Sequence, residues 1–362
     1  MGVKQARGRR GASAPLLVLL CAATALNAHR AHGRWKERLD VSLLYDSNVL
    51  EAVSNAHGDA AGSLAAYLAG SCRPSGATTL SLEYDGGLQI YGRHGGEDCM
   101  VHDLQIRCDR RVVPRLAAGI ACQGRSKLLF RSDRGYALYR ARPFLVWDLS
   151  ARLRSRFFCS FSRLDDVRET RFDYRQGSIG LCVERDLAAR LTGKLQYSLG
   201  RLMYDRTALD YRLFGSGAYQ WVSLGEEQED SRQEVTASLE FYRKVLMSCD
   251  LSYTSNRSNG YGYGYDQFGC QFLVARTLPR DLTMRLYWAF LLKQYTDNLR
   301  PLLQFRPDTE NEENSYALID LSKDLKERIS LRIRLGYYRN ESPFRDLYYE
   351  KSVCSAGVTG RF

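Results

Sequence analysis

The chain has 362 residues, 52 Lys and Arg against 41 Asp and Glu, and a formal net charge of +11. Its 44% hydrophobic and 11% aromatic content exceeds that of intrinsically disordered chains. No run reaches the roughly 18 apolar residues that a transmembrane helix needs, which excludes a helical membrane protein. The basic charge raises the question of nucleic-acid binding, which depends on whether the charges cluster.

The N-terminus predicts a secretory signal peptide. Four basic residues within the first ten precede an apolar stretch over 15–26, and small residues follow it. We place the signal peptide at 1–28, with cleavage between 25 and 33, and a single domain over 29–362. Removing 1–28 lowers the net charge from +11 to +7, because these residues contain four basic and no acidic side chains. Part of the basic excess therefore belongs to targeting.

After residue 39 the dominant hydrophobic period is two. In 282–292, for example, Leu282, Met284, Leu286, Trp288 and Phe290 alternate with more polar residues. Such alternation predicts strands with one apolar and one polar face. Helical periodicity is almost absent. The candidate strands lie at 39–50, 63–72, 78–92, 101–110, 115–124, 136–149, 152–164, 172–185, 190–203, 209–222, 233–243, 245–256, 262–276, 282–295, 314–325, 328–340 and 347–362.

The length and connection of these strands predict a transmembrane barrel. Many match the roughly 9–11 residues that a tilted strand needs to cross a bilayer. Short turns also alternate with longer polar loops, as in bacterial outer-membrane barrels. We therefore expect an all-β, antiparallel, up-and-down barrel. Pro143 falls inside a strand, where we expect a bulge or kink.

Seventeen candidates conflict with the even strand number of bacterial barrels. The mismatch falls between 203 and 232. If 209–222 is a hairpin arm of a long outer loop, sixteen strands close the barrel, which is the number we prefer. Eighteen and fourteen strands are the alternatives.

The ends of the mature chain resemble bacterial outer-membrane β-barrel proteins of the porin-like type. Ser355, Gly357 and the terminal Phe362 resemble the closing-strand signal that the barrel-assembly machinery reads, although Gly360 stands where a bulky apolar residue is usual. Residues 45–49 (Tyr-Asp-Ser-Asn-Val) resemble the first strand of such barrels. The resemblance implies an integral protein of a Gram-negative outer membrane, in contact with lipid and lipopolysaccharide and inserted by that machinery. It leaves the oligomeric state open.

The sequence offers no catalytic or metal site. The five histidines all precede residue 103, and His94 and His102 lack an obvious acid orienter or nucleophile motif. Seven cysteines share the apolar parity of their strands and no CxxC pair occurs, so we expect neither a zinc site nor a disulfide scaffold. Cys182 and Cys99 fall outside that pattern and leave one disulfide open. We therefore expect no enzyme activity and no cofactor.

The polar parity predicts the functional face. Its charges are spread over many strands, which disfavours a nucleic-acid patch and favours a water-filled lumen. We predict a passive, porin-like channel for small hydrophilic solutes, with anions favoured by the basic excess. The alternative is a barrel that exports or assembles a partner, or a structural surface protein without an open pore. The Gly-Tyr repeat over 260–265 is read as a loop entering the aromatic belt, or else as a surface that touches sugars or a partner. The pore-lining candidates are Arg107, Arg140, Arg142, Arg154, Arg156, Lys194, Arg212, Arg285, Lys293, Arg332, Arg334, Glu83, Asp85, Asp148, Glu240 and Asp250.

Overall fold

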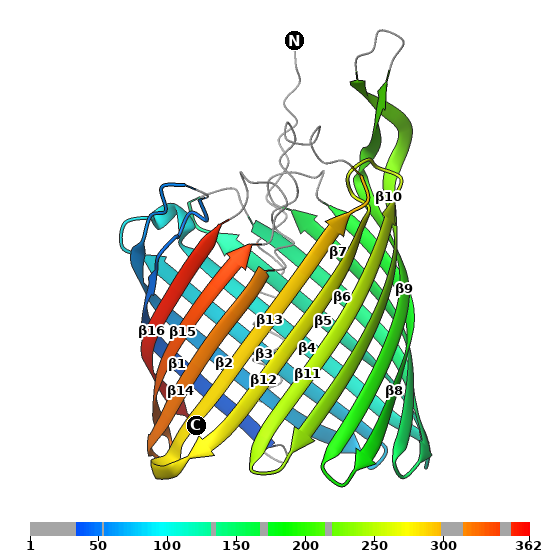
Figure 1. The fold of residues 1–362 in the computed structure, drawn as a ribbon. Helices are drawn as coiled ribbons and strands as arrows, with labels where there is room; N and C mark the ends of the chain where they lie inside the picture. Colours follow the sequence, from blue (N-terminus) through cyan, green and yellow to red (C-terminus); the bar gives the residue numbers. More distant parts are fainter. Residues whose placement is uncertain are drawn as a thin grey trace.

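The computed structural model is a closed barrel of sixteen antiparallel strands in sequential order (Figure 1). It describes residues 34–52, 54–131, 135–166, 173–213, 219–297, 314–340 and 349–362. The predicted signal peptide over 1–28 lies outside these residues and stays a prediction. The described residues contain no helix that is long and apolar enough to cross a membrane.

The strands are long and strongly tilted, as Figure 1 shows. Their bounds are β1 (Arg34–Asp46), β2 (Asp59–Ser75), β3 (Thr78–Tyr91), β4 (Cys99–Val113), β5 (Leu116–Leu129), β6 (Gly135–Ser150), β7 (Leu153–Asp166), β8 (Tyr174–Ala188), β9 (Leu191–Leu213), β10 (Tyr219–Tyr242), β11 (Val245–Ser258), β12 (Tyr265–Leu278), β13 (Leu282–Tyr295), β14 (Asn314–Lys326), β15 (Ile329–Asn340) and β16 (Glu350–Arg361). Two 3-10 turns, η1 (Gly95–Glu97) and η3 (Pro279–Asp281), lie in connections.

The predicted turn pattern is confirmed, with some turns shifted by a few residues. Two-residue turns join β2 to β3, β4 to β5, β6 to β7, β8 to β9, β10 to β11 and β14 to β15. These turns and the C-terminus lie at one end of the barrel, and the longer connections lie at the other. The β1–β16 pairing, from Arg38 opposite Arg361 to Asp46 opposite Val353, closes the ring.

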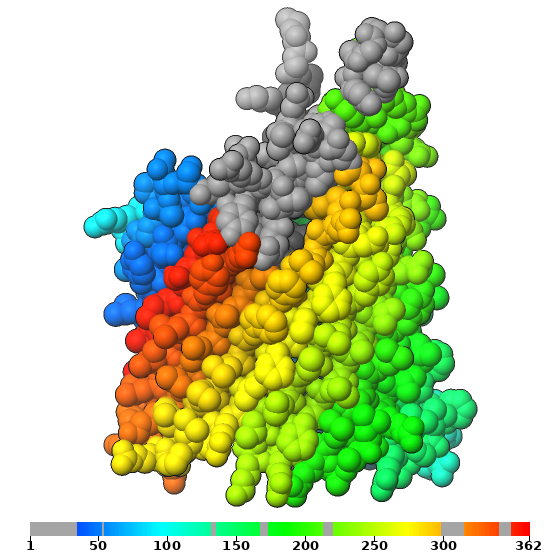
Figure 2. Space-filling view, in the orientation of Figure 1, coloured from blue at the N-terminus to red at the C-terminus, as the bar shows by residue number. Residues whose placement is uncertain are grey.

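The alternation of the sequence separates an apolar outer face from a polar inner face. On β1, the outward Leu39, Val41 and Leu43 are exposed, and on β15 so are Leu331 and Ile333. Figure 2 shows this outer surface as continuous across neighbouring strands. A soluble protein does not expose so much apolar surface, whereas a barrel in lipid must. The prediction of an outer-membrane β-barrel is confirmed in its architecture.

The described residues of the extra candidate strand at 209–222, namely 209–213 and 219–222, belong to the two arms of a projecting hairpin. β8 pairs with β9 as far as Tyr204, and β11 pairs with β10 from Asp230 onward. Beyond these points β9 and β10 pair only with each other, through register shifts between Ser223 and Glu229. The hairpin rises above the barrel rim (Figure 1). The preferred number of sixteen strands is therefore confirmed.

The Gly-Tyr repeat braces this hairpin from the β11–β12 connection. The Tyr261 N–H donates to the carbonyl of Leu209 at 2.8 Å, and the Tyr261 ring packs against Tyr211 and Trp221 at centroid distances of 5.7 and 6.0 Å. Gly262 has φ +85°, a left-handed conformation that favours glycine. The repeat is thus a buttress of the hairpin, a role that neither sequence-based interpretation included.

Pro143 does not produce the expected bulge. β6 and β7 keep one register on both sides of it, from Ala141 opposite Phe161 to Phe144 opposite Phe158. The intervening pairs, including Pro143 with Cys159, are absent from that ladder, while Pro143 still pairs with Ile120 of β5. Proline lacks an N–H donor, so the β6–β7 ladder loses steps there without gaining a residue.

Candidate functional site: the lumenal wall

The inner face of the barrel carries most of the predicted charged residues. Fifteen of the sixteen pore-lining candidates occupy inward positions, opposite in parity to the exposed apolar side chains. Arg212 is the exception: it lies on the projecting part of β9, where it pairs with Asp210. The prediction that Arg212 lines the lumen is therefore wrong. The alternating pattern that includes Arg212 continues into the part of β9 that pairs only with β10, above the barrel wall.

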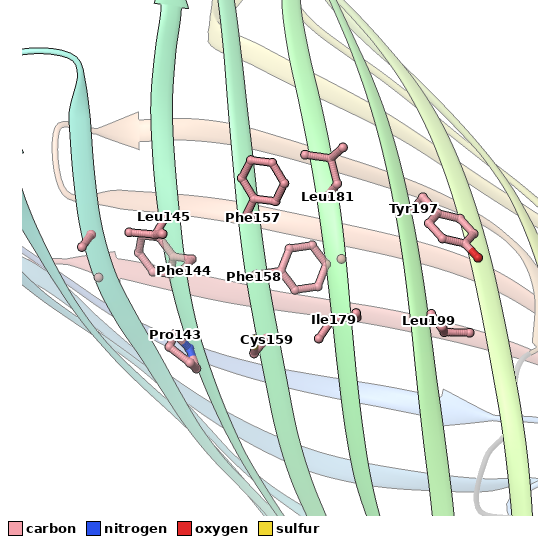
Figure 3. Close-up of a pocket in the computed structure, with 13 residues that line it drawn as sticks. Pro143, Phe144, Leu145, Phe157, Phe158, Cys159, Ile179, Leu181, Tyr197 and Leu199 are labelled. Carbon is pink, nitrogen blue, oxygen red and sulfur yellow. The ribbon is translucent and has the colours of Figure 1, made fainter.

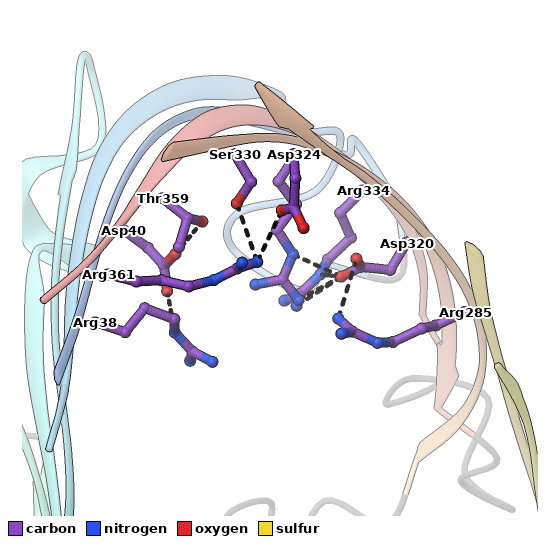
Figure 4. Close-up of polar contacts among 10 residues, drawn as sticks. Arg38, Asp40, Arg285, Asp320, Asp324, Ser330, Arg334, Thr359 and Arg361 are labelled. Atoms are coloured by element: carbon purple, nitrogen blue, oxygen red, sulfur yellow. Dashed lines mark hydrogen bonds and ion pairs between the residues drawn. The ribbon is translucent and has the colours of Figure 1, made fainter. Parts of the chain in front are cut away.

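One inward cluster is built around Asp320 of β14. Its side chain is 0% exposed, and its direct strand neighbours are Arg285 of β13 and Arg334 of β15. Arg332 Nε donates to Asp320 Oδ2 at 2.7 Å, Arg334 Nη2 donates at 3.1 Å, and Arg285 Nη1 lies 3.8 Å from Oδ1 (Figure 4). Three guanidiniums thus share one carboxylate, and the cluster keeps a net positive charge of two.

A neighbouring set of polar contacts lies at the closing seam of the barrel. Arg38 Nε donates to Asp40 at 2.9 Å, and the Thr359 hydroxyl donates to the same carboxylate across the β1–β16 pair. Arg361 Nη2 donates to Asp324 at 3.0 Å (Figure 4). These pairs are locally neutral, because each cation meets an acid. The seam is therefore polar without adding to the basic excess.

A second basic cluster lies on β4–β7 and contains two inward phenylalanines. Phe144 and Phe158 are directly opposite on β6 and β7, and they are only 6% and 7% exposed. Each ring covers a glycine directly opposite it on the next strand. A Cβ on Gly119 would lie 2.5 Å from the Phe144 ring, and one on Gly180 would lie 2.3 Å from the Phe158 ring. The glycines let both rings lie flat against the wall.

Guanidiniums lie over these rings. Arg107 and Arg156 lie 4.7 and 5.7 Å from the Phe144 centroid, and Arg142 lies 5.2 Å from that of Phe158. Cation–π contacts of this kind contribute about 0.5–2 kcal/mol. Arg107 also donates twice to Asp109 at 2.7 Å. The rings therefore hold the arginines against the wall.

Further acidic inward residues lie between these basic regions. Glu83, Asp85 and Asp103 lie on β3 and β4, and Glu234 and Asp250 lie on β10 and β11. In a ring of sixteen, β6 faces β14 and β3 faces β11. The basic regions therefore face each other, as do the acidic ones. Basic and acidic regions thus alternate around the lumenal wall.

The outer face carries a shallow apolar hollow of about 690 Å³ over β5–β9. Pro143 and Cys159 line it together with bulkier side chains such as Leu145, Phe157 and Tyr197 (Figure 3). Phe157 and Tyr197 have lipid-facing parity and are exposed. The hollow therefore belongs to the lipid-facing surface and not to the lumen.

The two histidines considered for catalysis lie apart from this wall chemistry. His102 faces outward, where its Nδ1 is 2.8 Å from the Tyr84 hydroxyl. His94 Nδ1 lies 3.1 Å from Asp59 at the outer rim, so the expectation that it lacks an acid orienter is wrong. No hydroxyl or thiol among the described residues is hydrogen-bonded to His94. The nine described cysteines are free thiols, and the described residues contain no cluster of metal-ligating side chains.

Sequence reasoning missed Phe144 and Phe158, although a signal was present. Phe157 and Phe158 are consecutive, as are Phe144 and Leu145. Because neighbouring strand residues point to opposite faces, one of each pair must enter the lumen. The same reasoning overlooked Arg361, and it overlooked Arg38 because the candidate strand began at residue 39 whereas β1 begins at Arg34.

No family model matches the sequence, and no curated protein is similar to it. Solved structures of similar fold include OccAB3 of Acinetobacter baumannii, with a TM-score of 0.48 and 10% identity over 91% of this chain and 99% of that one. Others are an anion-selective porin of Comamonas acidovorans (0.43, 11%, 91% and 99%) and a bacterial polysaccharide outer membrane secretin (0.44, 10%, 90% and 98%). These likenesses concern the fold alone.

Proposed function

We propose that this barrel is a passive channel for small hydrophilic solutes, with a preference for anions. The observation that carries the proposal is the inner wall, where basic clusters on β4–β7 and β13–β15 face each other. Barrels of sixteen strands are wide enough for an aqueous channel, whereas eight-stranded barrels fill with side chains. No enzymatic step is part of the proposal.

The wall would select solutes by fixed charge. Arg332 and Arg334 share one carboxylate, so their cluster attracts anions while Asp320 fixes the guanidinium positions. Charges lining a confined, low-dielectric channel raise the local concentration of counter-ions, and salt weakens this effect. Anion preference should therefore fall at high ionic strength.

The outer surface and the chain ends supply the proposed route to the membrane. We propose export by the signal peptide at 1–28 and insertion by the barrel-assembly machinery through Ser355, Gly357 and Phe362. Phe362 is 72% exposed at the barrel end, and the apolar outer band would contact lipid and lipopolysaccharide. Gly357 has a structural role as well, because a Cβ there would lie 2.5 Å from the Val41 carbonyl oxygen.

The alternative function, export or assembly of a partner, is favoured by one observation. The projecting β9–β10 hairpin carries a braced aromatic cluster of Tyr211, Trp221 and Tyr261 beyond the rim. Its described residues rise away from the lumen, so they do not fill the barrel. A soluble partner that is pulled down by the intact barrel, and lost when Trp221 is replaced by alanine, would support this alternative.

Swelling of liposomes containing the refolded barrel tests the channel. Small neutral and anionic solutes should enter, and anions faster than cations of equal size. Replacing Arg156, Arg332 and Arg334 with glutamine should reduce the anion rate more than the neutral rate. Equal slowing of all solutes, or none, would contradict the assignment of these arginines to the solute path.

A further inference from the structure

Three arginines of the β4–β7 wall differ from those around Asp320 in one respect. Arg285, Arg332 and Arg334 share a protein carboxylate. No carboxylate among the described residues lies within ion-pairing distance of Arg140, Arg142 or Arg156. Arg140 and Arg142 are successive inward residues of β6, and Arg156 of β7 lies opposite Val146, two inward positions farther along; Arg142 is within electrostatic range of both Arg140 and Arg156.

Two of these cations, Arg142 and Arg156, are partly removed from water without an acid beside them. The Nε atoms of Arg142 and Arg156 are buried and have no hydrogen-bond acceptor among the described residues. Arg142 has a longer-range electrostatic attraction to Glu234 of β10. Glu234 is itself paired with Arg232 at 3.5 Å. A partly buried cation without an acceptor loses free energy that a bound anion restores.

The geometry of the cluster suits a fixed binding site. Phe144 and Phe158 hold the Arg156 and Arg142 guanidiniums against the wall. Planar guanidiniums held in this way lose little conformational entropy on binding, and their N–H donors fit the oxygens of a carboxylate or phosphate group. Three uncompensated charges favour an anion with more than one charge.

We propose that Arg140, Arg142 and Arg156 form a saturable binding site for a doubly charged oxyanion, of the phosphate or phosphate monoester class. Asp320 shows the same chemistry inside this protein, with a carboxylate accepting from clustered arginines on the opposite wall. As a subsite for transported solutes the assignment rests on the proposed channel function. The binding itself does not require conduction.

Inorganic phosphate is the probe, titrated into the refolded full barrel in detergent and followed by calorimetry at low ionic strength. The wild type should bind phosphate saturably and more tightly than acetate. The double variant Arg142→Gln/Arg156→Gln should bind at least tenfold more weakly. Arg212→Gln is the control: it removes one arginine charge outside the barrel wall, and it should change the phosphate affinity less than twofold. Resistance to unfolding in SDS without heating verifies that each variant has folded.

Arg156→Lys separates a built site from general electrostatic attraction. It keeps the charge but loses the planar fork and the contact with Phe144, so phosphate affinity should still fall several-fold. Equal phosphate affinity in the wild type and the double variant would overturn the site. Phosphate binding without channel conductance would leave the site standing and refute the proposed function. Conductance without phosphate binding by the wild type would refute the binding site and leave the proposed channel function standing.

Discussion

Replacing Asp320 with asparagine removes the anion from a cluster that three cations share. The side chain keeps its size, but it can no longer neutralise Arg332 and Arg334, which donate to it at 2.7 and 3.1 Å. We expect the loss of this negative charge to have two effects. The barrel should lose stability, because the guanidiniums repel one another, and the lumen should gain one net positive charge.

The expected loss follows from the burial of the cluster. Breaking a fully buried ion pair costs about 3–5 kcal/mol, because the remaining charge stays uncompensated. Asp320 is 0% exposed, whereas the side chains of Arg285, Arg332 and Arg334 are 40%, 25% and 39% exposed and keep part of their hydration. We therefore expect a loss of about 2–3 kcal/mol in the free energy of unfolding.

The assay is urea unfolding of the refolded barrel in detergent micelles, followed by tryptophan fluorescence. Asp324→Asn is the matched control, because it lies on the same strand and face and pairs with Arg361 in a half-exposed contact. It should cost less than about 1 kcal/mol, as exposed ion pairs do. Equal effects of the two substitutions would refute the reasoning that burial sets the strength of the Asp320 cluster.

Three further predictions concern the seam, the rim and the hairpin. Gly357→Ala should destabilise the barrel by about 1–3 kcal/mol, because the new Cβ would meet the Val41 carbonyl oxygen. Gly87→Ala is the control and should not destabilise it, because the space around Gly87 is open. Equal urea midpoints of the two variants would contradict the close approach at Gly357. Burial raises the pKa of the Asp173 carboxyl, against the hydrogen bond from the Asp166 amide, so the fold favours the protonated form. That stabilisation is present below the ordinary aspartate pKa and is lost as pH rises through the raised value. The melting temperature of the wild type should therefore fall relative to Asp173→Asn between pH 4 and 7, and the opposite trend would refute it. Trp221→Ala should make the hairpin sensitive to protease without changing the urea midpoint of the barrel, whereas a lowered midpoint would show that the hairpin supports the wall.

The fold was predictable from the sequence because each strand has one lipid-facing and one water-facing side. That constraint forces a period of two, as in 282–292, and it also explains the exposed cysteines such as Cys122 and Cys354. The strand number was harder, because the hairpin at 209–222 also alternates. A two-stranded ribbon with one face on the Tyr261 buttress shows the same period as a strand in lipid.

For the functional face, the sequence predicted which residues point into the lumen but not which contacts they make there. Inward charge followed from alternation, but which arginines pair with an acid depends on the register between neighbouring strands, which alternation does not fix. Arg332 reaches Asp320 because β14 and β15 pair in that register, whereas Arg156 meets Phe144 and no acid. Arg212 was misplaced for a related reason: alternation continues beyond the point where flanking strands end.

The measurement that tests the channel most directly is current across a planar bilayer containing the refolded barrel, under a potassium chloride gradient. We predict discrete conductance steps and a reversal potential with the sign of chloride preference, because the opposed basic clusters of β4–β7 and β13–β15 dominate the inner wall. Absence of steps from barrels that resist SDS without heating would contradict the channel. A reversal potential with the sign of potassium preference would contradict the role of the arginine clusters.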